Sequence, residues 1–136
     1  MKRRNIAILA LLLLLLLTLA GCGSREEDAK NTASYQQITV EEAKSMMEEQ
    51  PDAVILDVRE KDEYDAGHIP GAVLLPVGTI NEETAASAIP EKDTVVLVYC
   101  RSGNRSKTAS QVLADLGYTQ IYEFGGIKDW PYEIER

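Results

Sequence analysis

Four short, mainly apolar stretches constrain the fold of this chain more than any other feature. They lie at residues 53–58, 72–77, 94–100 and 120–124. The first three contain so few polar residues that they are typical of strands covered on both faces, as in a parallel sheet. Segments with helical character separate them. This alternation predicts an α/β fold with a central parallel sheet flanked by helices.

Three segments are predicted to form helices. Thr39 and Glu42 have the spacing of a capping box that starts the first helix, and Pro51 prevents that helix from continuing. A second helix is predicted over residues 82–88 and the third over 105–116. In the third, apolar residues recur on one face, at Ala109, Val112, Leu113 and Leu116.

The N-terminus has the pattern of an export signal. Three basic residues precede an apolar run over residues 6–20, which only Thr18 interrupts. The run ends in Leu19-Ala20-Gly21-Cys22, which resembles the lipobox of bacterial lipoproteins. The resemblance implies that residues 1–21 are a lipoprotein signal peptide. It also implies that the Cys22 sulfur carries a diacylglycerol and anchors the protein in the cell membrane, on the extracytoplasmic side.

Two other interpretations of this segment are a membrane span and a plain cleaved signal. A helix of 15 residues covers about 22 Å, which is short of a hydrocarbon core of roughly 30 Å. Residues 22–36 then form a lipidated cysteine with a flexible tether, because residues 23–36 are too polar to bury much surface. The folded domain is predicted over residues 37–136.

The net charge excludes one class of partner. After removal of residues 1–21, the chain has 11 basic and 22 acidic residues and a net charge of about −11. Nucleic-acid binding needs clustered positive charge, so we expect no nucleic-acid partner. Contact with lipid would have to come from the acyl chains.

Cys100 lies between the apolar stretch 94–100 and the helix predicted over 105–116. Free backbone amides and the dipole at the start of that helix stabilise an anion, and Arg101 and Arg105 add positive charge. Both effects favour a thiolate. If lipid occupies Cys22, Cys100 has no disulfide partner in its own chain and is a candidate reactive thiol. A Cys22–Cys100 disulfide and an inert buried cysteine are the alternatives.

His68 is the only histidine in the chain. It could in principle pair with Cys100 as the base of a cysteine hydrolase, but no Asn or Asp is obviously placed to orient it. We therefore expect a structural role in loop packing. With one histidine and one free cysteine, no conventional zinc site is expected.

Three separated segments resemble a single-domain rhodanese, a sulfurtransferase module. They are residues 57–76, "DVREKDEYDAGHIPGAVLLP", residues 98–106, "VYCRSGNRS", and residues 124–130, "FGGIKDW". The resemblance implies a parallel sheet of about five strands. It also implies that Cys100 takes a sulfane sulfur from an anionic donor such as thiosulfate and passes it to a thiol or cyanide. The amides that would cradle this sulfur and the donor are those of Arg101, Ser102, Gly103, Asn104 and Arg105.

By the same likeness, Asp57 and Arg59 lie at a strand end beneath the loop, where we expect structural roles. We expect no cofactor or metal, and a monomer. One alternative is a rhodanese-fold module that binds a partner protein without turnover. The other is a cysteine phosphatase, whose loop has five residues between cysteine and arginine, whereas Arg105 comes one residue early.

Overall fold

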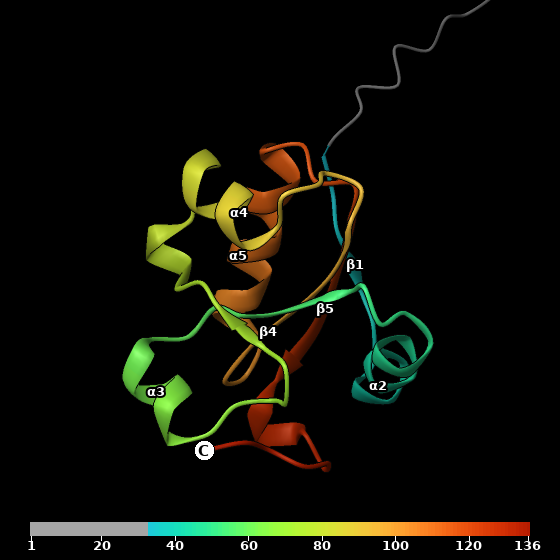
Figure 1. The fold of residues 1–136 in the computed structure, drawn as a ribbon, viewed down its shortest axis with the longest axis vertical. Helices are drawn as coiled ribbons and strands as arrows, with labels where there is room; N and C mark the ends of the chain where they lie inside the picture. The colour runs from blue at the N-terminus through green and yellow to red at the C-terminus, as the bar shows by residue number, and fades with distance from the viewer. Residues whose placement is uncertain (1–32) are drawn as a thin grey trace, which may run out of the picture. The chain divides into compact units, whose positions relative to one another are not determined.

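The computed structural model describes residues 33–136, which form one parallel sheet with helices on both faces (Figure 1). The five strands are β1 (Gln36–Gln37), β2 (Val54–Asp57), β3 (Val73–Leu74), β4 (Val95–Cys100) and β5 (Gln120–Gly126). Their order in the sheet is β1-β5-β4-β2-β3, and every neighbouring pair is parallel. The predicted fold class is therefore confirmed.

Four α-helices and one 3-10 helix connect the strands in the described part of the chain, and a second 3-10 helix follows β5. The α-helices are α2 (Val40–Glu49), α3 (Lys61–Ala66), α4 (Glu82–Ala88) and α5 (Asn104–Asp115). The 3-10 helices are η1 (Val77–Thr79) and η2 (Ile127–Asp129). Within residues 33–136, no helix has the length and apolar character that a membrane span requires.

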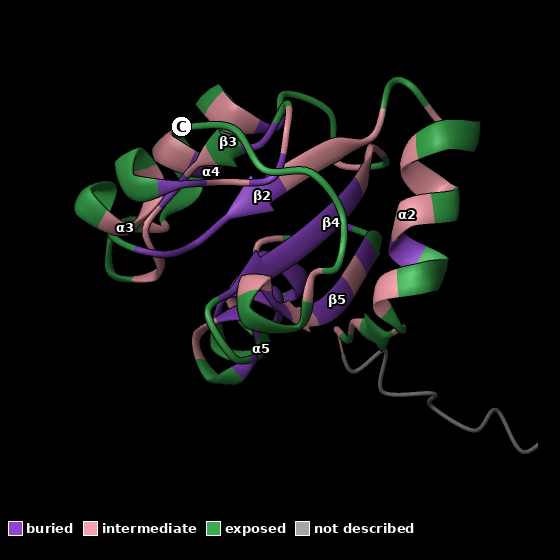
Figure 2. Ribbon diagram, turned by 90° about the horizontal axis from the view of Figure 1, so that it is seen from below, coloured by how far each residue is buried: buried purple, intermediate pink, exposed green. Residues whose placement is uncertain are grey.

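Alternate residues of β4 point to opposite faces of the sheet, as the pleat requires. Val96, Val98 and Cys100 belong to the core under α4 and α5, whereas Leu97 and Tyr99 belong to the core under α2. Figure 2 shows β4 buried along its length and α2 with its exposed side turned to solvent. Both faces of β4 are thus covered, which explains its continuous apolar sequence.

The predicted starts of the helices agree with the structure. Thr39 caps α2, since its hydroxyl accepts from the Glu42 amide at 3.1 Å and the Glu42 carboxylate accepts from the Thr39 amide at 2.7 Å. Helix α4 has the predicted bounds, and α5 begins one residue before the predicted helix.

Three elements differ from the predictions. Strand β3 is limited to two residues of the stretch 72–77, because Pro76 lacks an amide hydrogen and η1 follows. Helix α3 was not predicted because it has six residues and buries none. Strand β1 was not predicted, and it crosses the predicted boundary, since Gln36 belongs to the predicted tether and Gln37 to the predicted domain. It is polar and exposed, and it is held by backbone pairing to β5. The described chain before it also contacts the domain, because Gln111 Nε2 donates to the Ala33 carbonyl at 3.0 Å. The predicted signal peptide and Cys22 lie outside the described residues.

Candidate active site

Cys100 is the last residue of β4, and Arg101, Ser102 and Gly103 form the loop that leads into α5. Strand β4 lies between β5 and β2, so the thiol stands at the carboxyl edge in the middle of the sheet. Ligands of open parallel sheets bind at this edge. The Cys100 side chain is only 1% exposed, because the loop closes around it.

The loop directs hydrogen-bond donors at the sulfur. The Gly103 amide donates to Cys100 Sγ at 3.0 Å, and the thiol in turn contacts the Ser106 hydroxyl at 3.4 Å. Burial by itself would raise the pKa of the Cys100 thiol. The Ser106 hydroxyl and three backbone amides outweigh burial and lower this pKa below its ordinary value; the amides are those of Ser106, Gly103 and Ser102. The surroundings therefore favour a thiolate.

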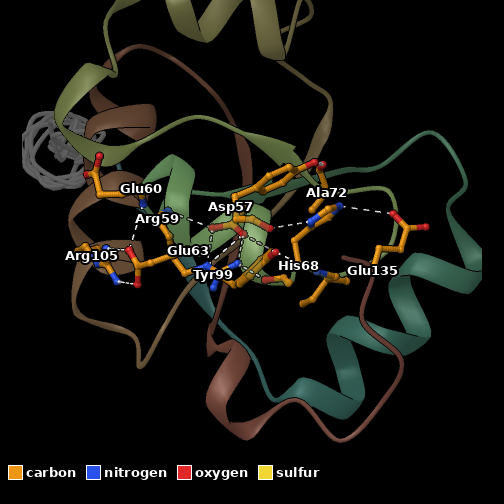
Figure 3. Close-up of polar contacts among 12 residues, drawn as sticks. Asp57, Arg59, Glu60, Glu63, His68, Ala72, Tyr99, Arg105 and Glu135 are labelled. Carbon is orange, nitrogen blue, oxygen red and sulfur yellow. Dashed lines mark hydrogen bonds and ion pairs between the residues drawn. The ribbon is translucent and has the colours of Figure 1, made fainter.

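The two predicted arginines contribute less than their positions in the sequence suggested. Arg101 is exposed. Arg105 forms a bidentate ion pair with Glu63 of α3, at 2.6 and 2.9 Å (Figure 3). Hydrogen bonding to Arg105 lowers the pKa of Glu63 to about 2. The charge of Arg105 is thus largely neutralised by the Glu63 carboxylate. The lowered pKa of Cys100 therefore arises mainly from the backbone amides and the Ser106 hydroxyl.

The remaining loop residues have distinct positions. Gly103 is buried and has a φ of +110°, a left-handed conformation that favours glycine and turns its amide toward the sulfur. Ser102 and Asn104 are exposed at the rim of the loop. Of the five predicted cradle residues, Gly103 and Ser102 direct amides at the sulfur, and the polar side chains of Ser102 and Asn104 are open to solvent.

Asp57, Arg59 and Tyr99 form a buried network that we call the ion-pair cluster. The Arg59 guanidinium donates to both Asp57 carboxylate oxygens, at distances from 2.6 to 3.1 Å, and the Tyr99 hydroxyl donates to Asp57 Oδ2 at 2.7 Å. Arg59 also donates to the Gly67 carbonyl, and Tyr99 accepts from the Ile69 amide. The cluster therefore ties the end of β2 to the loop that precedes β3 (Figure 3).

His68 lies in that loop, and its contacts are with Tyr64 and Glu135. Its ring stacks on Tyr64 with centroids 3.8 Å apart, and its Nε2 lies 3.4 Å from the Glu135 carboxylate. Backbone hydrogen bonds between His68 and Glu135 in both directions hold the C-terminal segment against the loop. These contacts do not bring His68 together with the thiol.

The sequence analysis missed two residues at the site, Ser106 and Glu123. Ser106 is fully buried in the first turn of α5, and Glu123 is a buried acidic residue of β5. The Ser106 hydroxyl donates to Glu123 Oε1 at 2.6 Å. We call Cys100, Ser106 and Glu123 the thiol cluster. The available signal was an acidic residue between Tyr122 and Phe124 in a stretch predicted to be a strand.

Gly126 of β5 lies directly against the backbone of the cysteine loop. A Cβ atom at this position would collide with the Arg101 carbonyl and the Ser102 amide. The Lys128 amide donates to the same Arg101 carbonyl at 3.2 Å. The absence of a side chain at Gly126 therefore permits β5 to approach the backbone of the cysteine loop.

A metal centre has no obvious place in this arrangement. Among residues 33–136, no group of three or more histidine, cysteine or acidic side chains is arranged to hold an ion. The chemistry available from the described side chains is that of a buried, hydrogen-bonded thiol.

The chain is similar in sequence to proteins named as sulfurtransferases and in structure to rhodanese domains. The chain is 38% identical over 74 residues to thiosulfate sulfurtransferase PspE of Escherichia coli, covering 54% of this chain and 70% of that protein. It is 34% identical over 97 residues to thiosulfate sulfurtransferase GlpE of Coxiella burnetii, covering 71% of this chain and 87% of that protein. A putative sulfur carrier protein of Bacillus subtilis, YrkF, is 32% identical, and the chain spans 58% of its length.

Two solved structures support the same assignment. A rhodanese from E. coli with bound anions has a TM-score of 0.58 at 33% identity, over 62% of this chain and 98% of that one. The rhodanese-like domain of an Anabaena protein has a TM-score of 0.67 at 29% identity, over 75% of this chain and 80% of that one. The family model for the rhodanese-like domain matches residues 39–132, and the chain belongs to this family.

Proposed function

We propose that this protein is a sulfurtransferase that carries a sulfane sulfur as a persulfide on Cys100. The observation that carries the proposal is the Gly103 amide, which donates to the sulfur at 3.0 Å inside a loop that lowers the pKa of the thiol. A thiolate is the nucleophilic form of cysteine. The thiosulfate sulfurtransferases among its relatives support thiosulfate as a donor to be tested.

The proposed reaction has two steps. The Cys100 thiolate attacks the outer sulfur of thiosulfate, an Sγ–S bond forms, and the S–S bond of the donor breaks so that sulfite leaves with the electron pair. Cyanide or a thiolate then attacks the outer sulfur of the persulfide and leaves as thiocyanate or a new persulfide, which restores the Cys100 thiolate. The exposed Arg101 and the loop amides would attract and orient the anionic donor.

The test is mass spectrometry and turnover of the purified protein. After mixing with thiosulfate, the Cys100 peptide should gain one sulfur, and cyanide should remove it with release of thiocyanate. Cys100→Ser should do neither. If no donor, including a polysulfide, adds sulfur to the wild-type peptide, the domain is a binding module without turnover. Hydrolysis of an aryl phosphate that is lost in Cys100→Ser would favour the phosphatase alternative.

We also propose that the domain is held at the extracytoplasmic side of a cell membrane through lipid on Cys22. The support is the sequence pattern of residues 1–22, which lies outside the described residues. Cells treated with globomycin, which blocks cleavage of lipoprotein signals, should accumulate a precursor that is larger by residues 1–21. Unchanged mobility in such cells, or membrane attachment that survives Cys22→Ala, would contradict lipidation.

A further inference from the structure

Glu123 is a buried carboxylate for which the proposed sulfur transfer has no use. It is 3% exposed in β5. Its Oε1 accepts from the Gly125 amide at 2.8 Å and from the Ser106 hydroxyl at 2.6 Å, and Gln37 of β1 donates to its Oε2 at 3.4 Å. None of the ion pairs among residues 33–136 includes Glu123. Burying an ionised carboxylate without a cation costs free energy, so it matters whether the Glu123 carboxyl group holds a proton.

Ser106 connects this carboxylate to the reactive sulfur. A hydroxyl has one hydrogen to donate and lone pairs to accept with. Glu123 Oε1 at 2.6 Å is a closer acceptor than the carbonyls of Gly103 and Gly125, at 3.0 and 3.3 Å. The Cys100 thiol can therefore donate to Ser106 Oγ while Ser106 donates to Glu123. The result is a continuous chain from S–H through O–H to a carboxylate.

We propose that Cys100 and Glu123 share one proton through the Ser106 hydroxyl. In one state the thiol is protonated and Glu123 is ionised. In the other, the thiol proton has passed to Ser106 Oγ, the Ser106 proton has passed to Glu123 Oε1, and the sulfur is a thiolate that accepts from the Ser106 hydroxyl. The O–H and S–H bonds broken and formed balance, and the total charge stays at one negative unit. Glu123 is thus a positioning residue that acts on Cys100 through Ser106.

This inference rests on the proposed role of Cys100 as nucleophile and extends it. Thiosulfate carries two negative charges, and a persulfide anion carries one. A proton held on Glu123 leaves a neutral acid beside the sulfur at the moment when these anions occupy the loop. Arg105 is already paired with Glu63, so removing the negative charge of Glu123 lessens a repulsion that no free Arg105 charge offsets.

A shared proton has a recognisable signature, because two coupled groups titrate in two macroscopic steps that belong to the pair. The experiment measures the rate of iodoacetamide alkylation of the Cys100 peptide between pH 4 and 10 by mass spectrometry, using the full chain. Wild-type protein should show a first rise to a plateau as the pair loses one proton and a second rise as it loses the other. A single rise in the wild type overturns the proposal without any variant.

Two variants and one control sharpen the result. Glu123→Gln, which keeps the shape and removes the charge, should show a single rise about one pH unit below the upper wild-type step, since the neighbouring negative charge is gone. Ser106→Ala should lose the lower step because the link is broken. Glu49→Gln removes an exposed carboxylate of α2 and should retain both steps. Two steps that persist in Glu123→Gln would overturn the proposal.

Alkylation reports on the thiol itself and does not depend on turnover. A protein that shows two steps but accepts sulfur from no donor would retain the shared proton and refute the proposed function. A protein that transfers sulfur but shows a single step would retain the proposed function and refute the shared proton. A Glu123 that only braces the loop predicts the same profile in wild type and Glu123→Gln, which is the third distinguishable result.

Discussion

The ion-pair cluster and the thiol cluster lie at the ends of neighbouring strands, yet they differ in charge balance. In the ion-pair cluster, the Asp57 carboxylate receives the Arg59 guanidinium and the Tyr99 hydroxyl, so a buried negative charge meets a buried positive charge. In the thiol cluster, Glu123 and Cys100 are both acids, and only neutral groups bond to them. The ion-pair cluster is balanced in charge, whereas the thiol cluster holds two acids and no cation, which is the arrangement that the proposed shared proton requires.

The comparison teaches how a small domain separates support from reactivity. The ion-pair cluster joins β2, β4 and the loop around Ile69 through hydrogen bonds of the Arg59 and Tyr99 side chains. The thiol cluster joins β4, α5 and β5 around a sulfur that the loop amides address. Three predictions test this division, from the largest expected effect to the smallest.

Breaking the ion-pair cluster should cost the most stability. Arg59→Ala leaves the Asp57 carboxylate buried without its cation, and losing one partner of a buried pair costs about 3–5 kcal/mol. Urea unfolding at pH 7 measures the change in the free energy of unfolding. Lys107→Ala removes an exposed cation of α5 and should stay within about 0.5 kcal/mol of wild type. Equal effects of the two substitutions would contradict the assignment of the cluster as the support.

The substitution Gly126→Ala should disturb the thiol cluster by displacing the backbone of the cysteine loop. The new Cβ would meet the Arg101 carbonyl and the Ser102 amide, so the loop must move, at a cost of about 1–3 kcal/mol. We expect slower alkylation of Cys100, because displaced amides stabilise its thiolate less. Gly78→Ala is the matched control, since no atom lies within 4 Å of a Cβ built there. A Gly126→Ala protein with the wild-type alkylation rate would show that this approach is unimportant.

The bridge between Glu63 and Arg105 should have the smallest effect on stability. Both side chains are partly exposed, so solvent screening limits the contribution to about 1 kcal/mol or less at pH 7. The pKa of Glu63 is lowered from 4.5 to about 2 by its hydrogen bond to Arg105. A depressed carboxyl pKa stabilises the folded state above the unfolded value, and this contribution disappears as the pH falls from about 4.5 toward 2.

Urea unfolding of wild type and Glu63→Gln at several pH values between 7 and 2 measures this. The two proteins should differ at neutral pH and converge in acid. For the proposed transfer of sulfur from thiosulfate, the Arg105 released in Glu63→Gln should also lower the KM for that donor. A difference in the free energy of unfolding that widens as the pH falls would contradict this prediction.

Local patterns were sufficient for much of the architecture. Helix α4 and the capping box at Thr39 follow from residues that are neighbours in sequence, and β4 follows from a continuous apolar run. Helix α3 and strand β1 were not predicted from the sequence, because neither buries an apolar face. Their positions depend on contacts with distant segments, including the bond from Arg105 to Glu63 across 42 residues.

The position of the cysteine loop could likewise be read from the sequence, but its electrostatics could not. Two nearby arginines suggested side-chain charge as the cause of an activated thiol. In the folded domain, Glu63 takes up the charge of Arg105, and the sulfur is addressed by amides and by Ser106. Proximity along the chain does not tell which partner a long side chain will choose.

The amino-acid sequence by itself determined the α/β architecture, the family resemblance and the placement of a lone cysteine at a strand end, because hydrophobic period and strand-to-helix order are properties of neighbouring residues. Only the tertiary structure decided which charges meet. Ser106 and Glu123 are 17 residues apart, and Asp57 and Tyr99 are 42 residues apart. Packing of α5 on β5 brings the first pair together, and the parallel pairing of β2 with β4 brings the second together. The free energy of a buried charge depends on that packing.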